Sequence, residues 1–136
     1  MIWVIFPAFN EEKVIRPTLL ALVAGMQGSG LPYRAILVDD GSRDASLARL
    51  KELAGQERRL RVLELRRNYG QTAALQAGFD AARGEILLSL DSDLQHFPED
   101  IPQFLEALDR GYEVVCGWRH QRAEGVVRRW PSRVLR

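Results

Sequence analysis

Residues 35–42 have the sequence Ala35-Ile36-Leu37-Val38-Asp39-Asp40-Gly41-Ser42, in which a short apolar run ends in two carboxylates and a glycine. A short apolar run bounded by turn residues is typical of a buried strand, and the acidic pair marks its carboxyl end. Four similar runs predict further strands, at residues 2–6, 60–65, 86–90 and 113–116. Because segments of helical period separate them, we predict an α/β fold with a Rossmann-like parallel sheet covered by helices.

The segments between the strands have the 3.6-residue apolar period of helices that bury one face. Gly28 and Gly30 end the first helix, and Pro98 opens the fourth. The predicted inner faces are Ile15, Leu19, Leu22, Val23 and Met26; Leu47, Leu50 and Ala54; Leu75, Gly78, Phe79 and Ala82; and Ile101, Phe104, Leu105 and Leu108.

The composition is that of an ordinary globular domain, with 136 residues, 46% hydrophobic and 27% charged. Cys116 lies in an apolar run, so we predict a small buried hydrophobe rather than a reactive thiol. No apolar run approaches the roughly 20 residues that cross a bilayer, and no secretion signal is recognised. We therefore expect a cytoplasmic protein.

Positive charge is concentrated near the carboxyl terminus, although the net charge is only +1. Residues 119–136 contain six arginines and one glutamate, whereas residues 1–118 contain thirteen basic and seventeen acidic side chains. We divide the chain accordingly into an α/β core, 1–118, and a basic segment, 119–136. The basic segment is either a solvated helix face or a surface that meets phosphates or an anionic membrane.

Ligands of parallel sheets gather beyond the carboxyl ends of the strands, and there the sequence has two acidic pairs. Asp91 and Asp93 follow the 86–90 run and could share one Mg²⁺ or Mn²⁺ through hard oxygen ligands. Asp39 and Asp40 form the second pair. Taken alone, each pair is also explained by turn formation or helix capping, with Ser42 as the cap in the second case.

A phosphate-binding loop of the GxxxxGK[ST] or GxGxxG type follows none of the predicted strands. A bound diphosphate would therefore need a metal and arginines, and the candidates are Arg119 and Arg122, with Arg128, Arg129 and Arg133 further on. Residues 7–12 place polar side chains at the end of the first strand, where a base or ribose would need partners. The same residues also fit an ordinary helix entry whose acids favour the helix dipole.

Six blocks resemble, in order and spacing, family 2 glycosyltransferases, and most closely their polyprenyl- and dolichyl-phosphate sugar transferase branch. The blocks are PAFNEE at 7–12, DDGS at 39–42, RNYGQ at 67–71, AGF at 77–79, DSDLQ at 91–95 and GWRHQR at 117–122. The resemblance covers nearly the whole chain and implies an A-type nucleotide-sugar fold. Enzymes of this type usually continue for about another hundred residues.

The resemblance also implies roles for individual residues. The base and ribose would be lined by Pro7, Ala8, Asn10, Glu11 and Asp39; Asp91, Asp93 and Gln95 would hold Mg²⁺ or Mn²⁺ under the diphosphate, with Asp40 beside them; Arg119, Arg122 and Arg133 would face phosphates of the donor or of a lipid acceptor. The implied partners are a nucleoside diphosphate sugar, a polyprenyl phosphate and the cytoplasmic face of a membrane, and no nucleic acid.

The implied reaction is transfer of the sugar to the phosphate carrier with inversion. A phosphate monoester, whose second pKa is about 6, is already mostly ionised at neutral pH, so we name no catalytic base. The alternatives are a non-catalytic or partner-dependent nucleotide-sugar-binding module, a nucleotidyltransferase and a receiver domain. A nucleotidyltransferase would need a basic glycine-rich loop after the first strand, and this sequence has none. A receiver domain would need an aspartate at the end of the third strand and a lysine at the end of the fifth, and the sequence has neither.

Overall fold

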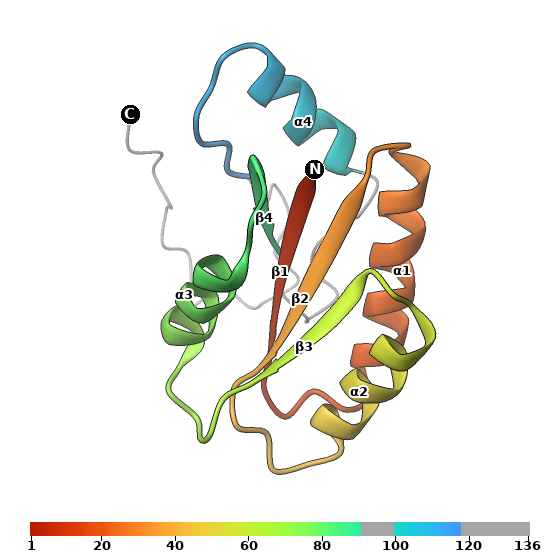
Figure 1. Ribbon diagram of the computed structural model, residues 1–136, viewed down its shortest axis with the longest axis vertical. Helices are drawn as coiled ribbons and strands as arrows, with labels where there is room; N and C mark the ends of the chain where they lie inside the picture. The colour runs from red at the N-terminus through yellow and green to blue at the C-terminus, as the bar shows by residue number, and fades with distance from the viewer. Residues whose placement is uncertain (91–99, 118–136) are drawn as a thin grey trace, which may run out of the picture. The chain divides into compact units, whose positions relative to one another are not determined.

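The computed structural model describes residues 1–90 and 100–117. Each of these two ranges belongs to a separate compact unit. The first unit is a parallel sheet with three helices (Figure 1). Its elements are β1 (Ile2–Ala8), α1 (Ile15–Gly28), β2 (Tyr33–Asp39), α2 (Ser46–Gln56), β3 (Leu60–Glu64), α3 (Gln71–Ala81) and β4 (Ile86–Ser89). The second unit contains α4 (Ile101–Asp109).

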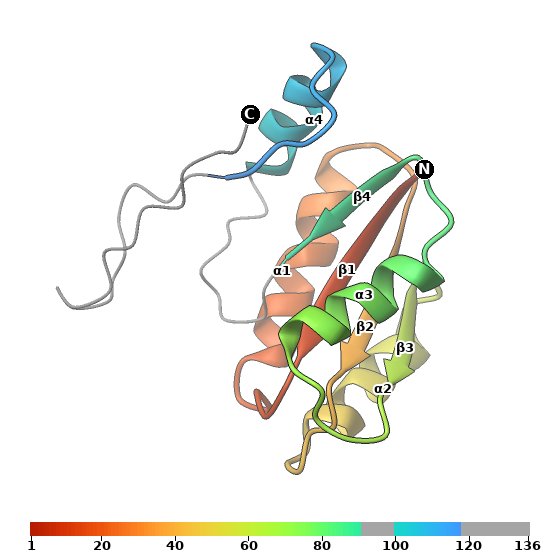
Figure 2. The same cartoon turned by 90° about the vertical axis from the view of Figure 1, so that its left-hand side faces the viewer.

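The strand order is β3-β2-β1-β4, and all neighbours are parallel. Helices α1 and α2 lie on one face of the sheet, and α3 lies on the other (Figures 1 and 2). The crossovers through α1 and α2 carry the chain from β1 towards β3, whereas the crossover through α3 returns it to the far side of β1. The direction in which successive strands are added to the sheet therefore reverses between β1 and β4. Parallel sheets bind ligands beyond the strand ends at such a point.

The core lies on both faces of the sheet because alternate side chains of a strand point in opposite directions. On the α3 face, Ile5, Ile36 and Val38 form one buried cluster with Ala74, to which Phe79 adds. Gly78 permits this packing: a Cβ at that position would lie 2.3 Å from Cγ2 of Ile5. Helix α3 thus approaches β1 through a residue without a side chain.

Pro7 lies inside a central strand, where proline normally removes a ladder hydrogen bond. The N–H of Leu90 donates to the carbonyl oxygen of Ile5 at 3.0 Å, and the described pairing of β1 with β4 stops at Ile5 and Ser89. The next bond of that ladder would need an N–H from residue 7, which proline does not have. Pro7 therefore ends the pairing with β4, while β1 stays paired with β2 as far as Ala8.

The predicted order of strands and helices in the first unit is confirmed, and the predicted strand ends lie within two residues of the observed ones. Helix α1 buries Ile15, Leu19, Leu22 and Met26. In α2 the buried residues are Ser46, Leu50 and Leu53, so the predicted face was displaced by about one residue. In α4 the predicted residues Ile101, Phe104, Leu105 and Leu108 are all at least partly buried.

Two predictions for the second unit are wrong. Residues 113–116 do not form a strand, and Cys116 is exposed rather than buried. An apolar run becomes a strand only when a neighbouring strand completes its hydrogen bonds, and within the described residues the sheet ends at β4. The predicted boundary between residues 118 and 119 lies outside the described residues.

Candidate functional site

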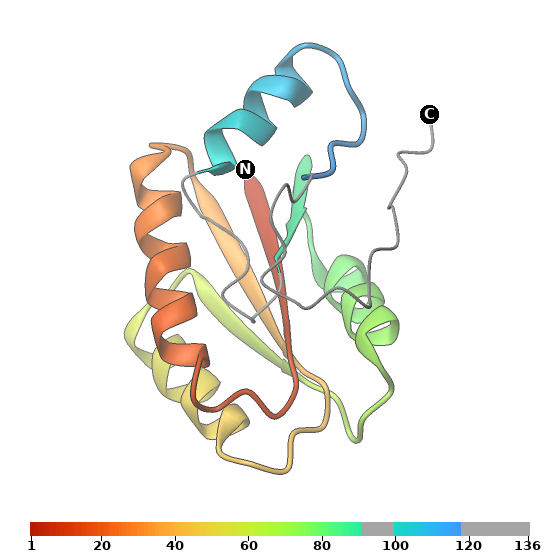
Figure 3. The same cartoon turned by 180° about the vertical axis from the view of Figure 1, so that it is seen from behind.

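Three loops meet at the carboxyl edge of the sheet, as Figure 3 shows from behind. They follow β1, β2 and β3, and they comprise residues 9–14, 40–45 and 65–70. We call them loops A, B and C. The residues predicted to line the base and ribose all lie at this edge.

Loops A and B are joined by hydrogen bonds between residues more than thirty positions apart. The N–H of Asn10 donates to Oγ of Ser42 at 3.0 Å, and Oδ1 of Asn10 accepts from the N–H of Arg43 at 2.8 Å. The N–H of Glu11 donates to Oγ of Ser46 at 2.8 Å. Asn10 adopts a left-handed conformation with φ of 49°, which asparagine tolerates better than most residues. The two loops therefore form one rim.

Asp44 strengthens this rim and the start of α2. Its Oδ1 accepts from the N–H of Ser46 at 2.9 Å and its Oδ2 from the N–H of Glu12 at 3.3 Å. Glu12 reciprocates through Oε2, which accepts from the N–H of Ala45 at 3.2 Å. Burial by itself would raise the pKa of Asp44, but the hydrogen bonds from Ser46 and Glu12 together lower that pKa below its usual value.

Asp40 joins loop C to β2. Its Oδ1 accepts from the N–H of Tyr69 at 2.8 Å, and its Oδ2 accepts from the N–H of Gly70 at 3.0 Å and from Nδ2 of Asn68 at 3.1 Å. The same Asn68 amide reaches the carbonyl oxygen of Asp40 at 3.2 Å. The side chain is only 3% exposed, and both of its oxygens are occupied.

Asp39 has different surroundings. It is 1% exposed, and its Oδ2 accepts from the N–H of Ser42 at 3.2 Å. Its Oδ1 is buried and has no hydrogen-bond partner in the part of the chain that is described. A buried polar atom without a partner costs free energy, on the order of 1–3 kcal/mol, which a ligand donor could recover. Asp39 therefore offers an acceptor at this edge to which a ligand donor could bind.

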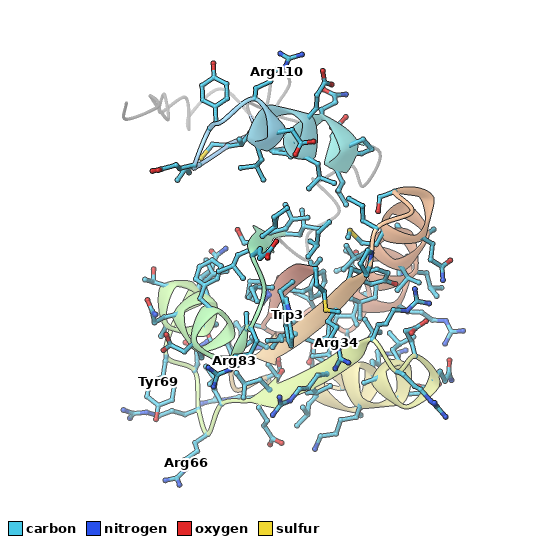
Figure 4. All side chains as sticks on the ribbon, turned by 45° about the horizontal axis from the view of Figure 1, so that its top comes forward. Trp3, Arg34, Arg66, Tyr69, Arg83 and Arg110 are labelled. Atoms are coloured by element: carbon cyan, nitrogen blue, oxygen red, sulfur yellow. The ribbon has the colours of Figure 1, made fainter. Side chains whose placement is uncertain are left out.

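Loop C presents an aromatic and a cationic side chain. The guanidinium carbon of Arg67 lies 4.7 Å from the centroid of the Tyr69 ring, and Tyr69 is 51% exposed. Figure 4 shows Arg66 and Tyr69 extending outward from this loop. The sequence reasoning used the RNYGQ block for the family resemblance but assigned it no role. Residues 66–70 lie directly after a predicted strand, where ligands of parallel sheets gather, and this position is the sequence signal that points to loop C.

The structure brings together six of the predicted site residues and does not describe the others. Pro7 and Ala8 are buried in β1, and the carbonyl oxygen of Ala8 accepts from the N–H of Asp40 at 2.9 Å. The other four are Asn10, Glu11, Asp39 and Asp40 in loops A and B and at the end of β2. Asp91, Asp93, Gln95, Arg119, Arg122 and Arg133 lie outside the described residues.

Among residues 1–90 and 100–117, no group of three His, Cys, Asp or Glu side chains is arranged to hold a metal ion. None of the described helices is both long enough and apolar enough to cross a membrane.

A second group of interacting charges lies away from these loops, at the start of β2 and β3. Arg59 stacks on Tyr33 at 4.8 Å and pairs with Glu57 through Nε and Oε1 at 2.8 Å. Burial raises the pKa of the Tyr33 hydroxyl. The hydrogen bonds from Arg59 lower the pKa of Glu57. The Arg59 side chain is 41% exposed, so we assign this group a modest structural role.

The chain is similar to bacterial enzymes that act on polyprenyl phosphates. It is 43% identical over 131 residues to the dodecaprenyl-phosphate galacturonate synthase of Rhizobium johnstonii, which covers 94% of this chain and 39% of that protein. It is 40% identical over 133 residues to the undecaprenyl-phosphate 4-deoxy-4-formamido-L-arabinose transferase of Pseudomonas fluorescens, covering 97% of this chain and 39% of that protein. The chain thus spans about 40% of the length of these relatives.

Solved structures of two proteins have the same fold. Residues 1–349 of S. aureus TarS, whose structures include complexes with UDP and UDP-GlcNAc, superpose with a TM-score of 0.62 at 26% identity, covering 80% of this chain and 32% of that one. The mannosyltransferase PcManGT from Pyrobaculum calidifontis, in complex with GDP-Man and Mn²⁺, gives a TM-score of 0.59 at 25% identity, covering 68% and 27%.

Residues 3–135 match the family described as glycosyl transferase family 2. The parallel sheet, the motif order and the relatives agree with this match, and the chain belongs to glycosyl transferase family 2.

Proposed function

We propose that the chain forms the donor-binding part of a transferase that moves a sugar from a nucleoside diphosphate to a polyprenyl phosphate, with inversion. The observation that carries the proposal is the buried, unpartnered Oδ1 of Asp39 at the carboxyl edge of the sheet. This oxygen could accept a hydrogen bond from a base N–H or a ribose hydroxyl. The printed names of the relatives supply the acceptor class.

Loops A and B would define the nucleoside side of the site because their hydrogen bonds fix the backbone around Asp39. Asn10 and Glu11 contribute their N–H groups to this scaffold rather than leaving them for a ligand. A site whose polar groups are already ordered loses little entropy when a ligand binds. We therefore assign Pro7, Ala8, Asn10 and Glu11 to the wall of the nucleoside site and Asp39 to direct hydrogen bonding.

The diphosphate would be held by Asp91, Asp93 and Gln95 through a divalent metal. Carboxylate and amide oxygens suit Mg²⁺ and Mn²⁺, so the donor set fits either ion. When bound, the ion supplies charge neutralisation on the leaving diphosphate. We assign Arg119, Arg122 and Arg133 to phosphates of the donor or of the lipid carrier, since planar guanidinium groups suit phosphate oxygens.

The carrier phosphate would attack the anomeric carbon from the face opposite the diphosphate. Because that phosphate is already ionised at neutral pH, the task of the protein is positioning and electrostatic stabilisation. We propose that the basic segment 119–136 approaches the cytoplasmic face of a membrane, where the carrier is anchored. A turnover assay with the carrier distinguishes this transferase from a module that binds the donor without reaction.

The test of the nucleoside site is calorimetry with UDP, GDP and the corresponding nucleosides in the presence of Mn²⁺. Asp39→Asn should weaken nucleoside and nucleotide binding alike, by about 1–3 kcal/mol for a lost charge-assisted hydrogen bond. If the affinity loss were confined to the diphosphates, Asp39 would belong to the phosphate side of the site. Unchanged affinity for both would remove Asp39 from the site.

A further inference from the structure

The two carboxylates that end β2 are adjacent in sequence and both almost fully buried, yet their hydrogen bonds differ. Asp39 has one oxygen with no partner among the described residues. Asp40 has three donors on its two oxygens, all from loop C. Successive side chains of a strand point to opposite faces, so the two carboxylates diverge at the strand end.

The Asp40 carboxylate has little capacity left for a ligand. Hydrogen bonds from loop C take three of the roughly four acceptor sites of this carboxyl group, so little room is left for a nucleotide hydroxyl or a cation. The donors are two backbone N–H groups and the Asn68 amide, all within residues 68–70. Asp40 is therefore organised to hold a backbone rather than to receive a donor molecule.

A second contact fixes the same segment. Gly41 has φ of +71°, and a Cβ there would lie 2.3 Å from the carbonyl carbon of Arg67 and 2.4 Å from the nitrogen of Asn68. The backbones of loops B and C thus touch directly beside Asp40. Together the two contacts fix the backbone from residue 67 to residue 70, including the residues that carry the exposed side chains.

The fixed segment presents Arg67 and Tyr69 beside the end of β2. The guanidinium of Arg67 stacks on the Tyr69 ring, and no carboxylate in residues 1–90 or 100–117 forms an ion pair with it. A stacked cation and aromatic ring at the same carboxyl edge of the sheet as Asp39 suit an anionic ligand with a planar base.

We propose that Asp40 is a positioning residue: it holds loop C so that Arg67 and Tyr69 border the nucleotide site, and it does not contact the nucleotide itself. The inference rests on the proposed function for the nature of the ligand. The hold on loop C is a property of the protein without ligand, and it can be measured separately.

The first experiment measures amide hydrogen exchange by NMR in the ligand-free chain. Asp40→Asn keeps one carbonyl acceptor, but its amide group cannot accept from Gly70 and Asn68, so the Tyr69 and Gly70 amides should exchange at least about tenfold faster. Amides of β1 and β2 should stay protected, which separates loop opening from global unfolding. Asn68→Ala, which leaves both backbone donors in place, should give a smaller effect in the same direction.

The matched control is Asp39→Asn, a neighbouring buried carboxylate, because the N–H groups of Tyr69 and Gly70 donate to Asp40 and not to Asp39. It should leave the exchange of both amides unchanged. Wild-type exchange rates at Tyr69 and Gly70 in Asp40→Asn would overturn the proposal, as would equal acceleration by Asp39→Asn.

The second experiment is a double-mutant cycle on the affinity for UDP and GDP with Mn²⁺. Asp40→Asn should weaken binding about tenfold, roughly 1.4 kcal/mol, but less than twofold in an Arg67→Ala background, because its effect passes through loop C. Equal losses in both backgrounds would mean direct contact and would overturn the proposal. If the wild-type chain bound neither nucleotide while loop C opened in Asp40→Asn, the nucleotide function would fail and the hold on loop C would stand.

Discussion

Gly41 shows how a single residue at the end of β2 controls the approach of two loops. Its positive φ and the Cβ position 2.3 Å from the Arg67 backbone are two separate reasons for glycine at this place. A side chain would both strain the left-handed backbone and force loop C away from loop B. The DDGS block therefore contains a packing requirement as well as acidic residues.

Gly41→Ala should lower the free energy of unfolding by at least about 1–2 kcal/mol, since the strain of a left-handed alanine and the backbone overlap add. The measurement is urea denaturation followed by circular dichroism. The control is Gly55→Ala inside α2, where nothing lies within 4 Å and alanine favours the helix by up to about 1 kcal/mol. Equal stability of the two variants would contradict the close approach of loops B and C.

The acidic pair at Asp91 and Asp93 carries the proposed metal dependence. Asp91→Asn with Asp93→Asn should abolish the part of nucleotide affinity that depends on Mn²⁺, because neutral amides are poorer ligands for a hard cation. Calorimetry with UDP and GDP, with Mn²⁺ or with EDTA, measures it. Unchanged affinity of the double variant in Mn²⁺ would show that the metal is held elsewhere.

Among the elements, the start of α2 is the one most closely tied to the site. The N-cap residue of this helix, Ala45, makes no side-chain capping hydrogen bond. Instead, the carboxylate of Asp44 accepts hydrogen bonds from the N–H of Ser46 and from the N–H of Glu12 in loop A. The same carboxylate therefore orders the helix terminus and the rim. This sharing explains why the hydrogen bonds outweigh burial and lower the pKa of Asp44.

The lowered pKa of Asp44 predicts a pH dependence of stability. A carboxyl group whose pKa is lower in the folded protein adds stability above its unfolded pKa of about 3.9, and that contribution is lost as the pH falls through the folded value. Asp44→Asn should therefore lower Tm near neutral pH, and the difference from wild type should shrink below about pH 4. Thermal denaturation from pH 7 to pH 3 measures it. A difference that stays constant over this range would contradict the assignment.

On the scale of the whole molecule, the uneven charge distribution suggests how the chain could meet a lipid carrier. Six arginines lie in residues 119–136, and the described helices cannot span a bilayer. Each basic residue near an anionic membrane contributes on the order of 1 kcal/mol, so a few together could hold the protein at the surface.

We expect the chain to co-sediment with vesicles that contain anionic lipid, and less so as salt shortens the Debye length. The variant with Arg128→Ala, Arg129→Ala and Arg133→Ala should bind more weakly. Vesicles of neutral lipid, anionic lipid and neutral lipid with polyprenyl phosphate separate charge attraction from carrier recognition. Negligible sedimentation of both proteins with every lipid would contradict a membrane role for this segment.

The sequence by itself determined the fold class, the strand and helix order of the first unit and the family. These properties are carried by apolar period, by turn residues and by motif order, all of which are local or sequential signals. The end of the sheet was not determined in this way. Residues 113–116 have the same apolar character as β4, yet a strand also needs a neighbour, and no local signal reports that neighbour.

Only the tertiary structure distinguished the hydrogen bonding of Asp39 from that of Asp40. In the sequence they are adjacent and chemically identical, and both were assigned to the nucleotide-sugar site. Their difference comes from donors 28 to 30 residues away, at Asn68, Tyr69 and Gly70, which occupy one carboxylate and leave an oxygen of the other open. Hydrogen-bond partners so distant in sequence meet only when the sheet has brought the strand ends together, so no local pattern could reveal which carboxylate is open.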